Sequence, residues 1–150
     1  MIFERISASD INDLAMMAHE LWPDATIPEL LIEFRERLSS DKDLLYICKR
    51  KDHSPVGFIH LSLRMEYVEG VSSFPVGYVE GIYVRKQYRR KGIASQLLRL
   101  GESWALEKGC TDLASDSEIR NPVSHPFHLS AGFCEVNRIV CYVKPIRNKS

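Results

Sequence analysis

The sequence lacks several features that would place it at once in a large class of proteins. Its 20 basic and 20 acidic residues cancel, so the formal net charge is zero. Proteins that coat nucleic acid or an anionic membrane surface normally carry an excess of positive charge. We therefore expect no nucleic-acid partner and no membrane partner, and any recognition of charge is expected to be local.

The cysteines and the apolar residues also exclude common classes. The four cysteines lie far apart and form no C-x-x-C pair, which argues against a zinc ribbon or a thioredoxin-like motif. We expect them to be reduced and mostly buried. No apolar stretch approaches the roughly 18 residues that a membrane-spanning helix needs. The first ten residues, MIFERISASD, lack the apolar segment of a signal peptide, so a cytoplasmic protein is predicted.

What is present indicates one α/β domain over residues 1–150, a length that can bury a substantial core. Apolar spacing predicts helices over 11–21, 28–38 and 93–109, and a short fourth helix within 117–132. Runs of β-branched and aromatic residues predict strands over 2–6, 44–50, 56–68, 76–84 and 111–115, with one or two final strands over 133–144. Two glycines inside 76–84, Gly77 and Gly81, indicate a bulge or a close approach by another backbone.

The stretch RKQYRRKGIAS at 85–95 is strongly basic and joins the fourth predicted strand to the third long helix. The first N–H groups of a helix are unpaired, and the helix dipole adds positive charge there. With Gly92 allowing close approach and Arg89, Arg90 and Lys91 supplying counter-charge, this helix start suits a pyrophosphate. Neither G-x-x-x-x-G-K-[ST] nor G-x-G-x-x-G is present. From these residues alone, a solvated basic turn is an equal interpretation.

The same stretch resembles a known family. RRKGIA at 89–94 is similar to the [QR]-x-x-G-x-[GA] loop of the GNAT-type N-acetyltransferase superfamily. GIYV at 81–84 resembles the bulged fourth strand of that family, and Asn121 with the later Gly-Phe pair at 132–133 resembles its "N…GF" signature. Further similarity is to one branch, the aminoglycoside 6'-N-acetyltransferases, in LWPD at 21–24, RMEYVEG at 64–70, PVGYVEGIYV at 75–84, ASD at 114–116 and SH at 124–125.

The resemblance implies a fold and a co-substrate. The fold would be a mixed, mostly antiparallel sheet that is flanked by helices and splayed between its fourth and fifth strands. The co-substrate would be acetyl-CoA, which lies in that splay with its phosphates on the basic loop. The residues implied to bind it are Ile82, Tyr83, Val84, Arg89, Arg90, Lys91, Gly92, Ile93, Ala94, Ser95 and Asn121.

The implied activity is acetylation of the 6'-amine of aminoglycosides, which would confer antibiotic resistance. Such a substrate is a sugar with several ammonium groups, so its pocket needs carboxylates and an aromatic wall. The matching residues are Trp22, Asp24, Glu66, Tyr67, Glu80 and Asp116. Relatives in this branch often carry an acid where this chain has Asn137, and Glu135 is the nearest acid that would serve instead.

Acetyl transfer requires a group that takes the proton of the amine. Glu80 leads Asp116 for this role because its strand contains the predicted bulge. Many family members also place a tyrosine near the departing thiolate, and here that position is His128. A histidine packed beside its helix is an equal interpretation. His125 and His128 have no third ligand at metal spacing, so no metal is expected.

Two other functions stay open at this point. In the first, the chain acetylates a different amine, such as a polyamine or a peptide. In the second, it is a non-catalytic acyl-CoA-binding module. The histidine at position 128 is the feature that favours the second of these. A homodimer is implied by the resemblance, and an exposed final strand would support it.

Overall fold

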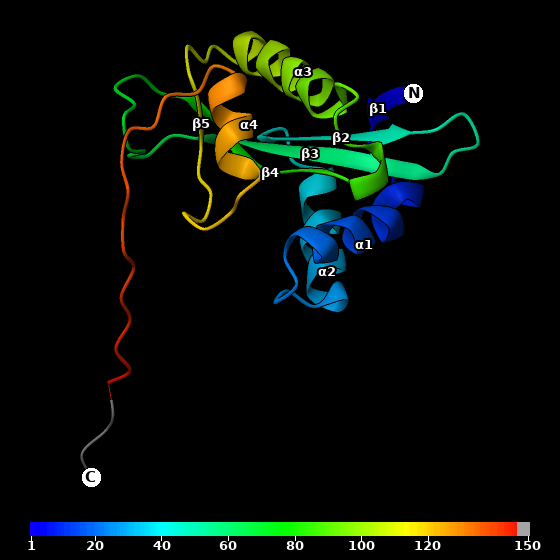
Figure 1. Cartoon of the computed structure of the whole chain (residues 1–150), viewed down its shortest axis with the longest axis horizontal. Coiled ribbons are helices and arrows are strands. Elements are labelled where there is room, and N and C mark those ends of the chain that lie inside the picture. Colours follow the sequence, from blue (N-terminus) through cyan, green and yellow to red (C-terminus); the bar gives the residue numbers. More distant parts are fainter. Residues whose placement is uncertain (147–150) are drawn as a thin grey trace. The chain divides into compact units, whose positions relative to one another are not determined.

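A five-stranded mixed sheet organises residues 1–116 (Figure 1). The structure, a computed structural model, describes residues 1–146. The strands are β1 (Ile2–Arg5), β2 (Asp43–Lys49), β3 (Pro55–Arg64), β4 (Val76–Val84) and β5 (Leu113–Ser115). They lie in the sheet in chain order; the pairs up to β4 are antiparallel, and β4 and β5 are parallel. The predicted mixed, mostly antiparallel sheet is thus confirmed.

Helices cover both faces of this sheet. They are α1 (Ile11–Leu21), α2 (Ile27–Leu38) and α3 (Ile93–Glu107), with 3-10 turns η1 (Ala8–Asp10) and η2 (Lys86–Tyr88). Figure 1 shows α1 and α2 on one face and α3 on the other. A capping box starts α2: the Thr26 hydroxyl accepts from the Glu29 N–H, and the Glu29 carboxylate accepts from the Thr26 N–H. The chain after α1 therefore enters a second helix without a long loop.

The two helical layers fix the middle of the sheet from both sides. Met17 of α1, Phe34 of α2 and Phe58 of β3 are buried in one apolar cluster. On the opposite face, a Cβ added to Gly101 of α3 would lie 3.0 Å from the methyl carbons of Leu61. The missing side chain lets α3 approach β3 closely. As a result β3 is packed against helices on both of its faces.

A bulge interrupts β4 at Glu80. His60 of β3 pairs with Gly81, and the next residue, Leu61, pairs with Val79, so Glu80 is the extra residue of β4. A bulge bends its strand and re-aims a side chain. The bulge that the glycines of this strand predicted is therefore present, one residue before Gly81.

The predicted elements of the first unit agree closely with the structure. The ranges predicted for the first helix and the fourth strand coincide with α1 and β4. The strand predicted over 56–68 is too long, because β3 ends at Arg64. Beyond it, Val68 is buried against Val76 and Tyr78, which turns residues 65–75 into a loop that folds back on the sheet.

The second unit begins at Ser117 and contains the predicted short helix, α4 (Ser124–Ser130). The strands predicted over 133–144 are wrong, because residues 133–146 contain no strand and are almost entirely exposed. A strand needs a partner for its ladder, and this segment pairs with none among residues 1–146. All four cysteines are free thiols, as expected; Cys48 and Cys110 are buried as predicted, whereas Cys134 and Cys141 are exposed.

Two features are absent from the part of the chain that the structure describes. None of the helices within residues 1–146 combines the length and the apolar character that crossing a bilayer requires. Across the same residues, histidine, cysteine and carboxylate side chains form no group of three or more that would hold a metal ion.

Candidate active site

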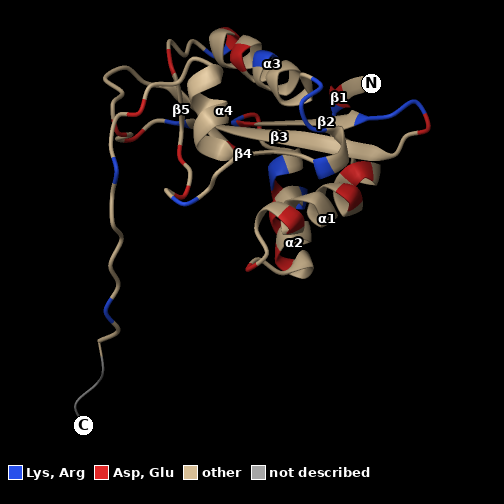
Figure 2. Ribbon diagram, viewed as in Figure 1, with Lys and Arg blue, Asp and Glu red and all other residues tan. Residues whose placement is uncertain are grey.

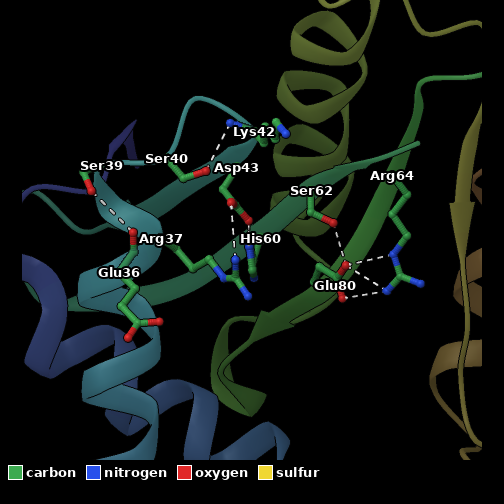
Figure 3. Close-up of polar contacts among 10 residues, drawn as sticks. All are labelled: Glu36, Arg37, Ser39, Ser40, Lys42, Asp43, His60, Ser62, Arg64 and Glu80. Atoms are coloured by element: carbon green, nitrogen blue, oxygen red, sulfur yellow. Dashed lines mark hydrogen bonds and ion pairs between the residues drawn. The ribbon is translucent and has the colours of Figure 1, made fainter. Parts of the chain in front are cut away.

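Polar side chains gather on the sheet face that also carries α1 and α2. Side chains alternate between faces along a strand. Phe58, which packs in the core under α1 and α2, therefore shares its face with His60, Ser62 and Arg64. Glu80, the bulge residue of the neighbouring strand, meets Ser62 and Arg64 there (Figure 3).

Glu80 is held by three donors on β3. The Ser62 hydroxyl donates to Oε1 at 2.6 Å. Arg64 donates to the same oxygen from Nε at 3.2 Å and from Nη2 at 2.9 Å, and Nη2 is also 3.2 Å from Oε2. The Glu80 side chain is 28% exposed, so a carboxylate without partners would be costly here. The arginine that satisfies it was not among the predicted site residues.

Asp116 is placed by Tyr78. The parallel pairing of Tyr78 with Ala114 brings Asp116, two residues later, to the hydroxyl end of the ring, and that hydroxyl donates to the Asp116 carboxylate. Burial, and then this hydrogen bond, raise the pKa of Tyr78 well above its usual value, so the hydroxyl remains a donor to a higher pH than that of a free tyrosine. The guanidinium carbon of Arg64 lies 3.5 Å from the Tyr78 ring centroid. One arginine therefore contacts both Glu80 and the residue that holds Asp116.

A second polar pair is buried on the same face, under α2. His60 Nε2 lies 2.7 Å from Asp43 Oδ1, and both side chains are about 5% exposed or less. Phe34 meets the imidazole edge-on, and Arg37 lies 4.0 Å from the other carboxylate oxygen. Burial alone raises the pKa of Asp43, but hydrogen bonds from His60 and Ser40 outweigh it and hold the pKa below its usual value. Figure 3 shows this pair beside the Glu80 group.

The loop after β3 supplies exposed residues next to Arg64. Arg64, Met65, Glu66 and Tyr67 line an open hollow of about 360 Å³. The Tyr67 side chain is 77% exposed, and a hydrogen bond to Glu69 raises its pKa. The predicted substrate residues Glu66 and Tyr67 thus line the same hollow as Arg64, the ion-pair partner of Glu80.

Trp22 lies over the bulge. It follows the last residue of α1, and a Cβ added to Gly81 would lie 2.5 Å from its ring. Only glycine at position 81 lets the indole pack on β4 there, against Phe58 at a centroid distance of 6.3 Å. Asp24 lies two residues further on, in the exposed turn before α2. The structure therefore places the Trp22 ring against Gly81, the residue that follows Glu80.

The edge of β4 beyond the bulge is open. β5 pairs with β4 only from Gly77 to Val79, so the part of β4 from Glu80 to Val84 has no strand beside it on that side within residues 1–146. The predicted splay between the fourth and fifth strands is confirmed. Tyr83 in this part donates to Glu20 of α1 at 2.5 Å, and burial followed by this bond raises its pKa.

The basic segment leads from β4 to the start of α3 (Figure 2). Arg89 Nε donates to the Val84 carbonyl at 2.7 Å, which folds the segment back on the strand. Arg90 and Gly92 both have left-handed backbone angles, with φ of 63° and 78°. No side chain in residues 1–146 caps the first turn of α3, and a Cβ added to Gly92 would meet nothing within 4 Å. The remaining predicted loop residues are Lys91, Ile93, Ala94 and Ser95, of which Ile93 is buried.

The predicted site residues of the second unit make local contacts. Asn121 Oδ1 accepts from the backbone N–H groups of Val123 and Ser124 at the start of α4. His128 Nδ1 lies 2.7 Å from the Ser124 carbonyl, and the imidazole meets Phe127 and Phe133 edge-on. The imidazole is thus packed beside its own helix.

Both polar candidates after α4 contact Arg138. Glu135 forms an ion pair with the Arg138 side chain. That pair lowers the pKa of Glu135, first through its hydrogen bond. Asn137 Oδ1 accepts from the Arg138 N–H at 2.8 Å. The Glu135 carboxylate therefore already carries a cationic partner.

Sequence reasoning missed Ser62, Arg64 and Tyr78, although a signal for the first two existed. In VGFIHLSLR at 56–64 the polar residues occupy every second position, which marks one polar face on an otherwise apolar strand. Tyr78 carried no comparable signal, because its contact with Asp116 depends on the β4–β5 register. Arg85 was also not among the predicted site residues. Its Nε is buried without a hydrogen-bond partner in residues 1–146.

Comparison with known proteins gives consistent results. The family model described as the acetyltransferase (GNAT) family matches residues 9–133. Among curated proteins, an aminoglycoside N(6')-acetyltransferase type 1 of Acinetobacter haemolyticus is 36% identical over 140 residues, which cover 93% of this chain and 95% of that protein.

Two solved structures are similar over nearly the whole length. The aminoglycoside antibiotic 6'-N-acetyltransferase AAC(6')-Ih from Acinetobacter baumannii has a TM-score of 0.89 at 34% identity, covering 97% of this chain and 99% of that one. AAC(6')-Iy, solved with the bisubstrate analog CoA-S-monomethyl-acetylneamine, has a TM-score of 0.89 at 30% identity, covering 97% and 98%.

Proposed function

Because this chain belongs to the acetyltransferase (GNAT) family, we propose that it transfers the acetyl group of acetyl-CoA to the 6'-amino group of aminoglycosides. The layout of β4 carries the proposal. Glu80 bulges from the middle of the strand among the polar residues of one sheet face, and beyond its end the basic segment leads to α3. One strand thus borders both a set of acids suited to amines and a helix start suited to phosphates.

The basic segment fits the diphosphate of acetyl-CoA. An uncapped helix start with open space over Gly92 offers unpaired N–H groups to an anion. The open edge of β4 offers backbone groups to the amides of the pantetheine arm, as an added strand would. The residues proposed to hold the co-substrate are Ile82, Tyr83, Val84, Arg89, Arg90, Lys91, Gly92, Ile93, Ala94, Ser95 and Asn121.

A carboxylate of the polar face accepts the proton of the amine. Acetyl-CoA supplies a thioester carbonyl, and only the neutral form of an amine attacks such a carbon, so a base has to accept one proton. Glu80 is the proposed base, with its carboxylate oriented by Ser62. Asp116, oriented by Tyr78, is the second candidate. His128 is the proposed proton donor on the thiolate side.

The substrate face combines rings and acids. Trp22 and Tyr67 offer aromatic surface to the sugar, and Asp24, Glu66, Glu80 and Asp116 offer negative charge to its ammonium groups. Asn137 and Glu135 are proposed to contribute from the second unit. The neutral chain would therefore bind two ligands of opposite charge, each through its own local cluster.

We place this activity in the cytoplasm, where acetyl-CoA would meet an aminoglycoside on its way to its target. Acetylation removes one positive charge from the antibiotic, so resistance would follow. We also propose that residues 1–150 act as one domain.

We further propose a homodimer formed by the exposed C-terminal segment. Val140, Tyr142, Val143 and Ile146 are at least 74% exposed, and an exposed apolar stretch of this kind marks an interaction surface. A second copy is the proposed partner because its own segment offers the same surface in return. Sedimentation analysis is expected to show a dimer, and a chain ending at residue 138 a monomer. A monomeric full-length chain would contradict the proposal.

A thiol-release assay tests the function. Purified protein with acetyl-CoA and a thiol-detecting dye is offered a neamine-type aminoglycoside, spermidine and a panel of peptides. Release with the aminoglycoside is expected. Release with only spermidine or a peptide would show an acetyltransferase for another amine, and tight acetyl-CoA binding without release would show a non-catalytic module.

Two variants test the location of the site. Glu80→Gln keeps the shape and the hydrogen bond to Ser62 but removes the base, and is expected to lower kcat by about 10²–10⁴. Tyr67→Ala removes exposed ring surface and is expected to raise the KM of the aminoglycoside. If both variants keep wild-type affinity and turnover, the pocket lies elsewhere.

A further inference from the structure

A basic cluster joins the turn between β2 and β3 to the basic segment. Arg50 directly follows β2, and its Nη1 donates to the Tyr88 hydroxyl of η2 at 3.4 Å. Lys91 Nζ lies 5.7 Å from the centroid of the same ring. The Arg85 N–H donates to the Val56 carbonyl at 2.9 Å, so the start of β3 and the start of the basic segment are neighbours. Figure 2 shows the turn and the segment at one end of the sheet.

Arg50, Tyr88 and Lys91 form what we call the turn cluster, and neither of its cations has an acidic partner. Both are exposed, and the ion pairs within residues 1–146 include neither of them. Asp52, in the same turn, accepts instead from the Ser54 N–H at 3.1 Å and from its hydroxyl at 2.6 Å. The positive charge of the turn cluster is therefore open to an anion from solution.

The turn cluster lies next to the helix start that suits a diphosphate. Lys91 directly precedes Gly92, where the start of α3 is uncapped within residues 1–146 and an added Cβ would meet nothing within 4 Å. Val84, the last residue of β4, pairs with Gly57, so the turn at 50–54 lies beyond the end of β4. A chain-like ligand that follows the open edge of β4 and passes the start of α3 would reach this region next.

Acetyl-CoA carries a group that suits this region. Besides its diphosphate it has a third phosphate, on the 3' oxygen of its ribose, and one sugar ring separates the two. Such a phosphate monoester carries about −1.5 to −2 charges at pH 7. Cations contribute to binding such a group through charge-assisted hydrogen bonds. A diphosphate at Gly92 would therefore bring a second anion close to the turn cluster.

We propose that the turn cluster is a second phosphate site, which binds the 3'-phosphate of acetyl-CoA and selects coenzyme A over its 3'-dephospho form. This inference rests on the proposed function and names a subsite for its co-substrate. Arg50 supplies a planar guanidinium that binds phosphate oxygens in pairs, and Lys91 supplies a point charge. Arg50 was not among the predicted site residues.

Tyr88 is the positioning residue of the turn cluster. Its hydroxyl accepts from Arg50, and its ring lies beside Lys91. The Tyr88 N–H donates to the Arg85 carbonyl at 2.9 Å, which closes the turn η2 and fixes the backbone that carries the ring. The two cations thus flank one half-buried ring, although they come from segments far apart in the sequence.

The test compares coenzyme A with 3'-dephospho-coenzyme A. Calorimetric titration of the full chain gives a Kd for each, and their ratio measures the contribution of the 3'-phosphate. In the wild type we expect coenzyme A to bind at least about tenfold more tightly, because two cations contact a group that the other ligand lacks. Arg50→Gln is expected to narrow the ratio about fivefold by weakening coenzyme A alone, since an exposed contact is partly screened by water.

Three variants refine the test. Arg50→Lys keeps the charge without the planar fork and is expected to retain part of the preference. Tyr88→Phe keeps the ring beside Lys91, removes the contact to Arg50, and is expected to lose less of the preference than Arg50→Gln. Lys108→Gln is the matched control, because Lys108 follows α3 at its other end and lies 6.0 Å from the Trp104 ring centroid. It is expected to leave the ratio unchanged.

Two results would overturn the inference: equal Kd values for the two ligands in the wild type, which requires no variant to fold, or an unchanged ratio in Arg50→Gln. Gly92→Ala separates the inference from the proposed function, because both ligands contain the diphosphate. This substitution is expected to weaken both in parallel and to keep their ratio. If both ligands bind equally and an aminoglycoside is acetylated, this inference alone falls. If neither ligand binds, the proposed function falls with it.

Discussion

The Ser62 hydroxyl donates a 2.6 Å hydrogen bond to Oε1 of Glu80 across the point where the register of β3 and β4 shifts. Glu80 has no residue opposite it on β3, since His60 pairs with Gly81 and Leu61 with Val79. An unpaired bulge residue is free to aim its side chain in several directions. The bond from Ser62 and the contacts from Arg64 together therefore select the direction in which the carboxylate points.

Replacing Ser62 by alanine is expected to lower kcat about tenfold with a smaller effect on KM, because a misplaced base slows the reaction more than it weakens binding. Ser62→Thr keeps the hydroxyl and is expected to recover most of the rate. Ser39→Ala, an exposed serine after α2, is the matched control. Equal kcat values for Ser62→Ala and wild type in the thiol-release assay would contradict this role.

Tyr78→Phe is expected to destabilise the folded chain by about 1–2 kcal/mol at pH 8, because the buried donor to Asp116 is lost while the ring under Arg64 is kept. The raised pKa of Tyr78 adds a dependence on pH. Below about pH 10 the hydroxyl is protonated in both states, and its contribution is complete. Above that pH the unfolded chain releases the proton and the folded chain keeps it, so wild-type stability falls.

Urea unfolding at pH 8 and near pH 11 checks the sign of this effect. The difference between wild type and Tyr78→Phe is expected to narrow at the higher pH. A difference that stays constant or widens would show that the Tyr78 hydroxyl is not the group that titrates.

The polar face of β3 could be predicted from the sequence, but its partner could not. Alternation along VGFIHLSLR places Ser62 and Arg64 on the face that carries Phe58. The bulge in β4 removes Glu80 from the regular alternation of side chains between the two sheet faces. The register of β3 and β4, which decides the partner of Glu80, is set by tertiary packing. Glycines indicated that β4 is irregular, and the structure shows which residue the irregularity re-aims.

The C-terminal segment shows a different limit of sequence reasoning. Residues 133–144 are rich in the β-branched and aromatic residues that favour strands. That preference reflects how well such side chains pack once the strand is hydrogen-bonded to a neighbouring strand. Residues 133–146 form no such pairing within the described chain. The partner of a strand is set by the tertiary fold and leaves no separate mark in the sequence, so composition alone overestimated the strand content of residues 133–144.

Asp43→Asn is expected to destabilise the folded chain by about 3 kcal/mol at neutral pH, since it removes the anionic member of a buried pair with His60. The pKa of Asp43 is lowered in the folded chain despite burial. Its contribution is therefore present above the usual aspartate pKa and is lost as the pH falls through the folded value. Unfolding at pH 7 and below pH 4 is expected to show a difference from wild type that shrinks in acid.

Asp41→Asn is the control for this pair, because Asp41 is exposed two residues earlier. It is expected to change stability by less than about 0.5 kcal/mol. Equal effects of the two substitutions would show that the pair contributes through its general charge and not through the contact with His60.

Alanine substitutions at the two glycines that flank α3 distinguish the effect of backbone strain from the effect on ligand binding. Gly92 precedes the helix and Gly109 follows it, with φ of 78° and 84°, and an added Cβ meets nothing within 4 Å at either. Each alanine substitution is expected to cost about 1 kcal/mol of stability, because a left-handed backbone disfavours a side chain. Only at Gly92 would the new methyl group project into the space where unpaired N–H groups face an anion. The affinity for acetyl-CoA is therefore expected to fall at least tenfold in Gly92→Ala. In Gly109→Ala it is expected to stay unchanged. Calorimetric titration with acetyl-CoA measures both, and parallel losses of affinity would mean that the helix start is not where the diphosphate binds.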